Sequence, residues 1–246
     1  MTARGTQPPT ASTEEAINLL ATGELRLLGL MPRASNYTFL AEAEKDGRIA
    51  LAVYKPRDGE APLWDFPEGT LCRREVAAFV LAESLGWPAI PPTVLRDGPH
   101  GLGSVQLFVE ASPREHFFTL RGRRLNEFRP VAAFDAVANN ADRKGGHCLL
   151  APDGVIWSVD HGVCFAAEPK LRTVIWDFAG QPIPPNLLSD LGRVCVEVRS
   201  GGLRQRLLAL LSPEEVDVLA GRIQAVVRSG QFPKPGPDRP YPWPPV

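Results

Sequence analysis

The sequence lacks long apolar runs and any excess of charge of one sign. Lysine and arginine number 27 against 28 acidic residues in 246, which gives a formal net charge of −1. A nonspecific nucleic-acid binder normally carries a basic excess, so we expect no nucleic-acid partner. No apolar run is as long as a transmembrane helix, and the N-terminus has no charged start followed by an apolar signal core. These absences predict a soluble, cytoplasmic protein without stable membrane insertion.

Cysteine and histidine are also sparse. The four cysteines lie far apart and form no C-x-x-C pair, which argues against a zinc knuckle or a disulfide framework and predicts buried, reduced thiols. The four histidines show no H-E-x-x-H spacing, so structural zinc is not expected.

The first half of the chain is predicted to consist mostly of strands. Residues 1–11 are small, polar and Pro-containing and are expected to be disordered, whereas Ser12–Glu15 has the pattern of a capped helix start. A second helix should begin after Thr70 as its cap and end at Gly86. Strands are expected at Glu24–Leu30, Tyr37–Glu44, Ile49–Lys55, Thr93–Arg96 and Ser104–Glu110, of which the first three form an antiparallel meander.

The second half is predicted to be mainly helical. Phe134 and Val137 have helical spacing, and a small hairpin should follow at Cys148–Leu150 and Val155–Val159. Further helices are expected around Leu187–Leu191, around Leu203–Leu211, and from the cap Ser212 through Val227. From Phe232 onward the chain is rich in proline and should be extended, and it either packs, stays free or binds a partner.

This change of character predicts two lobes with a tail at each end. The expected division is a tail at 1–11, an N-lobe at 12–111, a helical C-lobe at 112–230 and a Pro-rich tail at 231–246.

Two short polar stretches carry the candidate chemistry. Residues 139–147 and 159–162 place Asp142 and Asp160 on tight turns, each beside an apolar run that reads as a strand. Such a pair suits one carboxylate that orients a hydroxyl and another that holds a metal on a polyphosphate. Asn, Asp and Gly also populate turns for conformational reasons alone, so an Asx-turn at Asp142 and a hairpin turn at Asp160 are the competing interpretations.

The order of these stretches in the chain resembles a known superfamily. Lys55 on an expected strand, Glu75 on an expected helix and an apolar strand ending at Glu110 precede the two acidic loops. This ordered set resembles the atypical protein and lipid kinases, with the phosphatidylinositol 3/4-kinase-like and HipA-like kinases as the closest branches, and more narrowly an actinobacterial group labelled phosphatidylinositol-kinase-like. The resemblance covers roughly residues 24–180. It implies an α+β, two-lobed, protein-kinase-like fold with an antiparallel-sheet N-lobe and a mainly helical C-lobe, and ATP with Mg²⁺ or Mn²⁺ as cofactors.

By this resemblance, the N-lobe supplies the nucleotide contacts. Lys55 would contact the phosphates and Glu75 would hold Lys55 in place, although a surface lysine and a solvated glutamate are the alternatives. The turn at residues 33–36 lies where a phosphate-covering loop would, but it lacks the Gly-rich signature. The implied nucleotide contacts are Ser35, Asn36, Lys55, Glu75 and the hinge residues Phe108, Val109 and Glu110, and the hinge residues could equally be a core strand.

The C-lobe would supply the catalytic and metal-binding residues. Asp142 matches the aspartate of the family's Asp-Arg-His-x-x-Asn pattern and would accept the acceptor's proton, while Asp160 matches the metal-binding aspartate of Asp-Phe-Gly. The sequence departs from the pattern at two positions, because Lys144 replaces His and His147 replaces the metal-binding Asn. Lys144 would stabilise the transferring phosphoryl group or be a solvated loop lysine. His147 would bias the metal site toward Mn²⁺ or leave Mg²⁺ held mainly by Asp160, since Mg²⁺ prefers oxygen ligands.

The resulting prediction is an ATP-dependent phosphotransferase. Its acceptor is expected to be a hydroxyl of a protein or small molecule rather than a lipid, because the chain has no basic amphipathic helix of the kind that docks on anionic membranes. The run 172–180 occupies the activation-segment position, where its aromatic residues either recognise acceptors or belong to the core. A nucleotide-binding pseudokinase or regulatory scaffold, and a kinase-fold AMP transferase, are the alternatives.

Overall fold

The chain forms two compact units that interleave along the sequence. In the computed structural model the described residues are 13–32, 36–237 and 239–246, so the predicted tail 1–11, the cap Ser12 and the candidate Ser35 lie outside them. Unit 1 comprises the described residues of Met1–Pro62 and Pro92–Phe108, and unit 2 comprises those of Leu63–Pro91 and Val109–Val246.

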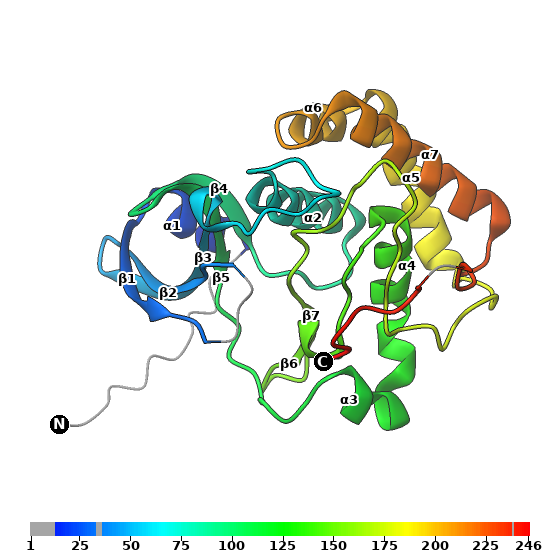
Figure 1. Ribbon diagram of the computed structural model, residues 1–246, viewed down its shortest axis with the longest axis horizontal. Helices are drawn as coiled ribbons and strands as arrows, with labels where there is room; N and C mark the ends of the chain where they lie inside the picture. Colours follow the sequence, from blue (N-terminus) through cyan, green and yellow to red (C-terminus); the bar gives the residue numbers. More distant parts are fainter. Residues whose placement is uncertain (1–12, 33–35, 238) are drawn as a thin grey trace. The chain divides into compact units, whose positions relative to one another are not determined.

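Unit 1 is a five-stranded antiparallel sheet with one α-helix. The strands follow the order β1-β2-β3-β5-β4, and α1 packs against the sheet (Figure 1). Its elements are α1 (Thr13–Thr22), β1 (Glu24–Leu30), β2 (Phe39–Lys45), β3 (Arg48–Pro56), the 3₁₀ turn η1 (Arg57–Gly59), β4 (Thr93–Gly98) and β5 (Gly101–Leu107).

The two faces of this sheet differ because side chains alternate along each strand. On β3, Ala50, Ala52 and Tyr54 are buried in one cluster with Leu19 and Leu20 of α1. The alternate residues of β3, which include Lys55, therefore point to the opposite face. Small alanines on the covered face let the helix approach closely, and they leave Lys55 on the face that α1 does not cover.

Unit 2 is mainly helical. Its helices α5 and α7 pack along one another, and α2 packs against α5 and α6. Its elements are α2 (Leu71–Leu85), α3 (Phe117–Arg124), η2 (Leu125–Phe128), α4 (Arg129–Ala138), η3 (Gly145–His147), β6 (Cys148–Leu150), β7 (Ile156–Ser158), α5 (Pro185–Ser200), α6 (Gly202–Leu208) and α7 (Pro213–Ser229).

The ends of two helices follow local sequence signals. α2 stops where Gly86 adopts a left-handed conformation with φ of 82°, as the sequence predicts. At its start the Thr70 side chain makes no capping bond, because its hydroxyl donates to Pro67 O over 2.7 Å. At α7 the predicted cap is confirmed, since the Ser212 side chain accepts from the N–H of Glu215 while Glu215 bonds back to Ser212 N.

Most predicted elements are confirmed. The meander, the small hairpin and the helices predicted in the second half occur where the sequence predicts them, and all four cysteines are buried and free. Two differences stand out. The strand predicted at Ser104–Glu110 is β5 at Gly101–Leu107, so Phe108, Val109 and Glu110 follow the strand instead of ending it. The Arg-rich helix α3 was not predicted.

The predicted lobes are a functional division of the chain, and the compact units are a structural one. The N-lobe predicted at 12–111 contains α2, whereas α2 belongs to unit 2. The functional division of the chain into the lobes 12–111 and 112–230 stays a prediction. Across the part of the chain that the structure describes, every helix is too short or too polar to cross a lipid bilayer.

Candidate active site

The end of α4 anchors the first polar loop. Asn139 follows the helix in the left-handed conformation, with φ of 54°, which asparagine tolerates better than most residues. Its amide group donates to the carbonyls of Ala166 and Glu168 over 2.9 and 2.6 Å, and its carbonyl accepts from the N–H of Lys170 over 2.8 Å. Asn139 thus fixes the segment after Ala166 against the end of α4.

Asn140 then directs the backbone of the candidate base. Its side-chain amide donates to buried Asp135 over 2.9 Å, and its side-chain oxygen accepts from the N–H of Asp142 over 3.0 Å. The Asx-turn in this loop is therefore made by Asn140. The Asp142 carboxylate instead forms an ion pair with Lys144, with 3.1 Å between the Lys144 Nζ and Asp142 Oδ2 atoms.

A buried ion pair holds the loop from the inside. Arg143 and Asp135 have no solvent exposure, and the guanidinium donates to both carboxylate oxygens over 3.0 to 3.2 Å. Arg143 also donates to Val159 O over 2.9 Å and lies 2.6 Å from Nε2 of His161. A guanidinium has only donors, so a hydrogen bond at this position requires Nε2 of His161 to accept. Arg143 therefore ties the loop that carries Asp142 to the turn that carries Asp160.

The hairpin β6–β7 brings the second acid to the first loop. Cys148 pairs with Ser158, and one residue beyond this pair the N–H of Val159 donates to His147 O over 3.0 Å. Asp160 follows with a positive φ of 61°, and its Oδ2 lies 3.2 Å from Nε2 of His147. The N–H of His161 donates to the carboxylate of Glu75 on α2 over 2.8 Å. The turn at Asp160 is thus held by the hairpin and by α2.

Asp142 lies in an environment that disfavours its charged form. Burial raises the pKa of Asp142 above its ordinary value, Lys144 opposes this rise, and the neighbouring charge of Asp160 adds to it. The side chain of Asp142 is still 34% exposed and that of Asp160 is 50% exposed. Two carboxylates from two loops therefore influence one another at a surface that solutes can reach.

His147 faces Asp160 as a hydrogen-bond donor. The N–H of Lys144 lies 3.4 Å from Nδ1 of His147, so Nδ1 is an acceptor and the proton of a neutral ring is on Nε2. That Nε2–H faces the Asp160 carboxylate. Among the described residues there is no group of three or more His, Cys, Asp and Glu side chains arranged to hold a metal ion.

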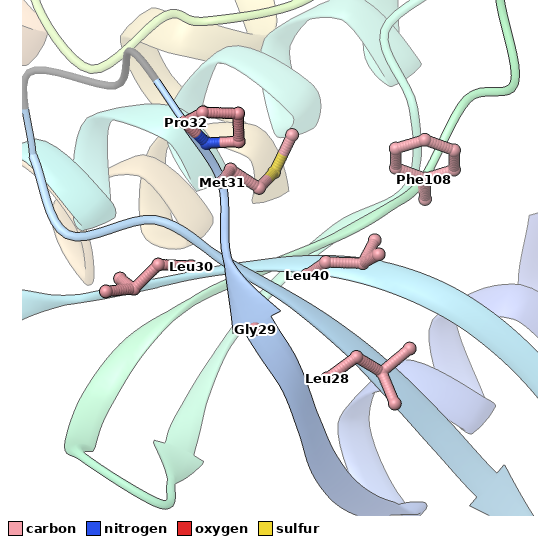
Figure 2. A pocket seen from close by; sticks show the side chains of 7 residues that line it. All are labelled: Leu28, Gly29, Leu30, Met31, Pro32, Leu40 and Phe108. Carbon is pink, nitrogen blue, oxygen red and sulfur yellow. The ribbon is translucent and has the colours of Figure 1, made fainter.

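Unit 1 carries an apolar pocket on the sheet face that bears Lys55. Leu40 of β2 pairs with Val53 of β3, so Leu40 and Lys55 share a face. Figure 2 shows the lining residues, which come from β1, from the two residues that follow β1, from β2 and from the residue after β5. The pocket encloses about 430 Å³ and is lined by Leu28, Gly29, Leu30, Met31, Pro32, Leu40 and Phe108.

The remaining candidates have separate positions. Asn36 uses its side-chain oxygen to accept from the N–H of Ala61 over 2.7 Å. Phe108 is the last residue of unit 1, and Val109 and Glu110 begin the next stretch of unit 2. Lys55 belongs to unit 1 and Glu75 to unit 2, so the expected pairing of Lys55 with Glu75 stays a prediction.

Sequence reasoning assigned no role to Asp135 or Arg143, or to the pocket residues of β1. A signal existed for Asp135, which is the one acid in the apolar α4 sequence from Pro130 to Ala138. A signal also existed for β1, where Leu27 and Leu28 break strict alternation.

Comparison with known proteins links the chain to one protein over nearly its full length. No family model matches the chain. Protein Rv2133c of Mycobacterium tuberculosis is 37% identical over 261 residues, covering 92% of this chain and 94% of that protein.

Two plant enzymes match more weakly. Phosphatidylinositol 4-kinase gamma 4 of Oryza sativa subsp. japonica is 27% identical over 61% of this chain. Phosphatidylinositol 4-kinase gamma 3 of Arabidopsis thaliana is 24% identical over 58% of this chain. In each case the match spans only 33% of the plant protein.

Solved structures share the fold. The Helicobacter pylori proinflammatory kinase CtkA aligns with a TM-score of 0.52 at 14% identity, over 87% of this chain and 94% of that one. Hydra Fam20, solved with sugar, aligns with a TM-score of 0.55 at 14% identity, over 91% of this chain and 89% of that one. The fold is kinase-like and α+β, as the sequence predicts.

Proposed function

The chain belongs to the family of the Mycobacterium tuberculosis protein Rv2133c, and from that premise we propose that it is an ATP-dependent phosphotransferase of the atypical kinase class. It moves a phosphoryl group to a hydroxyl of a protein or small molecule with the help of a divalent metal. One observation carries the proposal: in a chain with a kinase-like fold, two carboxylates on two different loops, Asp142 and Asp160, lie near enough for the charge of Asp160 to raise the pKa of Asp142.

Asp142 is the proposed base. A carboxylate is a better proton acceptor when its pKa is raised toward the working pH, and burial raises the pKa of Asp142. Lys144 holds this carboxylate in the resting protein through their ion pair. When an acceptor hydroxyl bonds to Asp142, Lys144 supplies fixed positive charge for the oxygens of the transferring group.

Asp160 is the proposed principal metal ligand. Mg²⁺ is usually held by one or two carboxylates together with substrate phosphates, so a site with few protein ligands fits this metal. Asp160 has an exposed carboxylate and a neighbouring acid, which suits that arrangement. His147 either binds Mn²⁺ or orients Asp160, and its Nε2–H toward Asp160 favours the orienting role. A bound divalent metal would neutralise charge on the phosphate oxygens.

Unit 1 is proposed to bind the nucleotide. Its pocket has the size and apolar lining of a small-molecule site, and it shares a sheet face with Lys55, the proposed phosphate ligand. Glu75 is proposed to hold Lys55. Phe108, Val109 and Glu110 are the proposed hinge residues. Ser35 and Asn36 contribute main-chain contacts to the phosphates in this proposal, because the Asn36 side chain is already bonded to Ala61 N.

The acceptor is the least constrained part of the proposal. The plant relatives are named for a lipid substrate, but the chain spans only a third of their length. We favour a protein or small-molecule hydroxyl over a lipid, because the Arg-rich helix α3 has only eight residues and buries Phe117 and Leu120 in the core, which leaves little apolar face for a membrane.

Analysis of the nucleotide product tests the proposal. The protein is incubated with ATP and Mg²⁺ or Mn²⁺, alone, with a protein mixture and with phosphatidylinositol vesicles, and the nucleotides are identified by mass. The proposal predicts ADP. AMP with pyrophosphate would indicate an AMP transferase, and ATP binding without turnover would indicate a pseudokinase or scaffold. Asp217→Asn is the matched control for the variants Asp142→Asn and Asp160→Asn. Asp217 is an exposed acid on α7 that pairs with Arg204, so its variant should behave like the wild type.

A further inference from the structure

The Pro-rich C-terminus returns to the loop that carries the candidate base. Residues 239–246, called the C-terminal strap below, lie in unit 2 and are drawn in red close to β6 and β7 in Figure 1. Pro240 O accepts from the N–H of Thr173 over 3.0 Å and from the indole N–H of Trp176 over 3.1 Å. Pro245 O accepts from the N–H of Gly145 over 2.8 Å. The strap is thus hydrogen-bonded near both of its ends. The bond that Pro245 accepts comes from Gly145, which lies three residues after Asp142.

The composition of the strap suits this attachment. Proline has no N–H, so a Pro-rich segment offers carbonyl acceptors, and its backbone loses little freedom when it becomes ordered. Pro242 is buried, whereas Tyr241 and Trp243 are 50% and 76% exposed. The inner side of the strap is therefore a packed surface with defined bonds, and its two aromatic side chains face away.

The bond at Gly145 acts directly on the backbone of the catalytic loop. A Cβ atom on Gly145 would lie 2.8 Å from the Phe118 ring, so this glycine is packed closely against α3. Its N–H is held by the strap. Gly145 adjoins Lys144, the ion-pair partner of Asp142. Arg143 and Thr173 form a backbone bridge, so both attachment points of the strap belong to neighbouring segments.

The strap does not cover the acids. With the strap docked, the side chains of Asp142 and Asp160 remain 34% and 50% exposed. A segment that blocked the site would bury these carboxylates. The contact is therefore of a kind that holds the loop in place.

We propose that the C-terminal strap is a positioning element that fixes Gly145 and, through it, Lys144 and His147 relative to Asp142. Gly145, Thr173 and Trp176 bind the strap through hydrogen bonds to its carbonyls. The strap thereby holds the loop at the protein surface, and the buried Asp135–Arg143 pair holds the same loop in the core. The catalytic consequence rests on the proposed phosphotransfer, whereas the ordering of the loop does not.

Pro242→Asp in the full chain tests the proposal, because a charge at this buried position is driven into water and detaches the strap. Hydrogen exchange of the peptide that spans Gly145–His147 is measured without nucleotide, followed by kcat and KM for ATP. We expect exchange of the Gly145 amide to accelerate by roughly tenfold. This ratio corresponds to the upper end of the net free energy that one hydrogen bond contributes. We expect kcat to fall by about tenfold or more with KM for ATP changed less than about twofold, since small misplacements of catalytic groups act on turnover.

A second test variant and two controls separate this effect from general destabilisation. Pro235→Asp places the same charge at an exposed position of the tail outside the strap and should leave exchange and kcat unchanged. Trp176→Phe keeps an aromatic side chain but removes the indole donor to Pro240, and it should change both readouts in the direction of Pro242→Asp. Trp87→Phe removes an indole bond made to Asp190, over 3.0 Å, and should not affect the loop.

Exchange at Gly145 that stays at the wild-type rate in Pro242→Asp overturns the proposal. A rise in kcat also overturns it, because release of a blocking segment would then be the correct account. If the wild type turns over no ATP, the proposed function fails, and the exchange experiment still decides whether the strap orders the loop.

Discussion

At the scale of single residues, two neighbours in the site, Asp142 and Arg143, have different environments. Asp142 is partly buried and electrostatically unfavourable as an anion, while Arg143 beside it is fully buried and fully bonded. Groups with perturbed pKa values concentrate at functional sites, because catalysis requires charge states that folding alone would not favour. The raised pKa of Asp142 therefore supports its proposed role, and Arg143 holds the loop that carries it.

Asp142→Asn tests the electrostatic environment of Asp142 through the pH dependence of stability. The pKa of Asp142 is raised in the folded chain, so this carboxyl favours folding below its ordinary pKa of 3.8 and the contribution is lost as pH rises through the folded pKa. The substitution removes this titration. The melting temperature of Asp142→Asn, relative to the wild type, should therefore increase between about pH 4 and pH 7. Scanning fluorimetry across this range checks it, and a relative stability that falls with rising pH would refute the assigned environment.

His147→Asn tests the metal assignment. The substitution restores the oxygen ligand of the kinase pattern and removes the imidazole that faces Asp160. The ratio of Mg²⁺-supported to Mn²⁺-supported ATP binding should rise by roughly tenfold, the scale on which ligand-orienting groups act on metal affinity. Titrating both metals gives the ratio. A strong Mg²⁺ preference that is the same in wild type and variant would count against any role for His147 at the metal.

At the scale of elements, the site depends on how a helix end, a hairpin and a turn are joined. α4 delivers Asn139 and Asn140, the hairpin β6–β7 sets His147 beside Asp160, and Arg143 bonds to both parts. The hairpin was predictable from its two short apolar runs and from the turn residues Pro152, Asp153 and Gly154 between them. The Asp135–Arg143 pair was not, because the sequence does not reveal which buried acid faces which base eight residues away.

Breaking this pair should destabilise unit 2. Asp135→Asn leaves Arg143 as an uncompensated buried charge, so the free energy of unfolding should fall by about 3 kcal/mol or more. Glu83→Gln is the matched control, because Glu83 pairs with Arg206 at the surface over 2.6 Å and such pairs contribute about 0 to 1 kcal/mol. Urea denaturation measures both. Equal losses in the two variants would mean that the buried pair does not hold the loop.

The pocket formed by β1 and β2 can be tested in the same way. Leu28→Asp places a charge in its lining, and the Kd for ATP should rise by roughly tenfold because a pocket of this kind gains affinity from apolar contact. Ile49→Asp is a matched control, since Ile49 is 41% exposed and Leu28 is 42% exposed, and Ile49 is not part of the pocket. Isothermal titration measures both. Similar Kd values for the two variants would remove the pocket from the nucleotide site.

At the scale of the whole molecule, most elements were predictable because they depend on local patterns, whereas the kinase-like fold class followed from the family resemblance in the order of Lys55, Glu75 and the two acidic loops. The turn residues Asp46 and Gly47 between β2 and β3, the glycine at 86 and the capping box at Ser212 are each visible in the sequence. Properties that are set by long-range packing left no such signal in the sequence. Examples are the placement of α2 in unit 2, the end of β5 at Leu107 and the return of the Pro-rich strap to Gly145.

The most direct test of the central claim compares Asp142→Asn with Asp160→Asn in ATP binding and ATP turnover with metal present. If the two acids divide the work as proposed, Asp160→Asn weakens metal-dependent ATP binding, whereas Asp142→Asn binds ATP like the wild type and loses turnover by about a hundredfold or more. Wild-type rates of ADP formation in both variants would contradict the account.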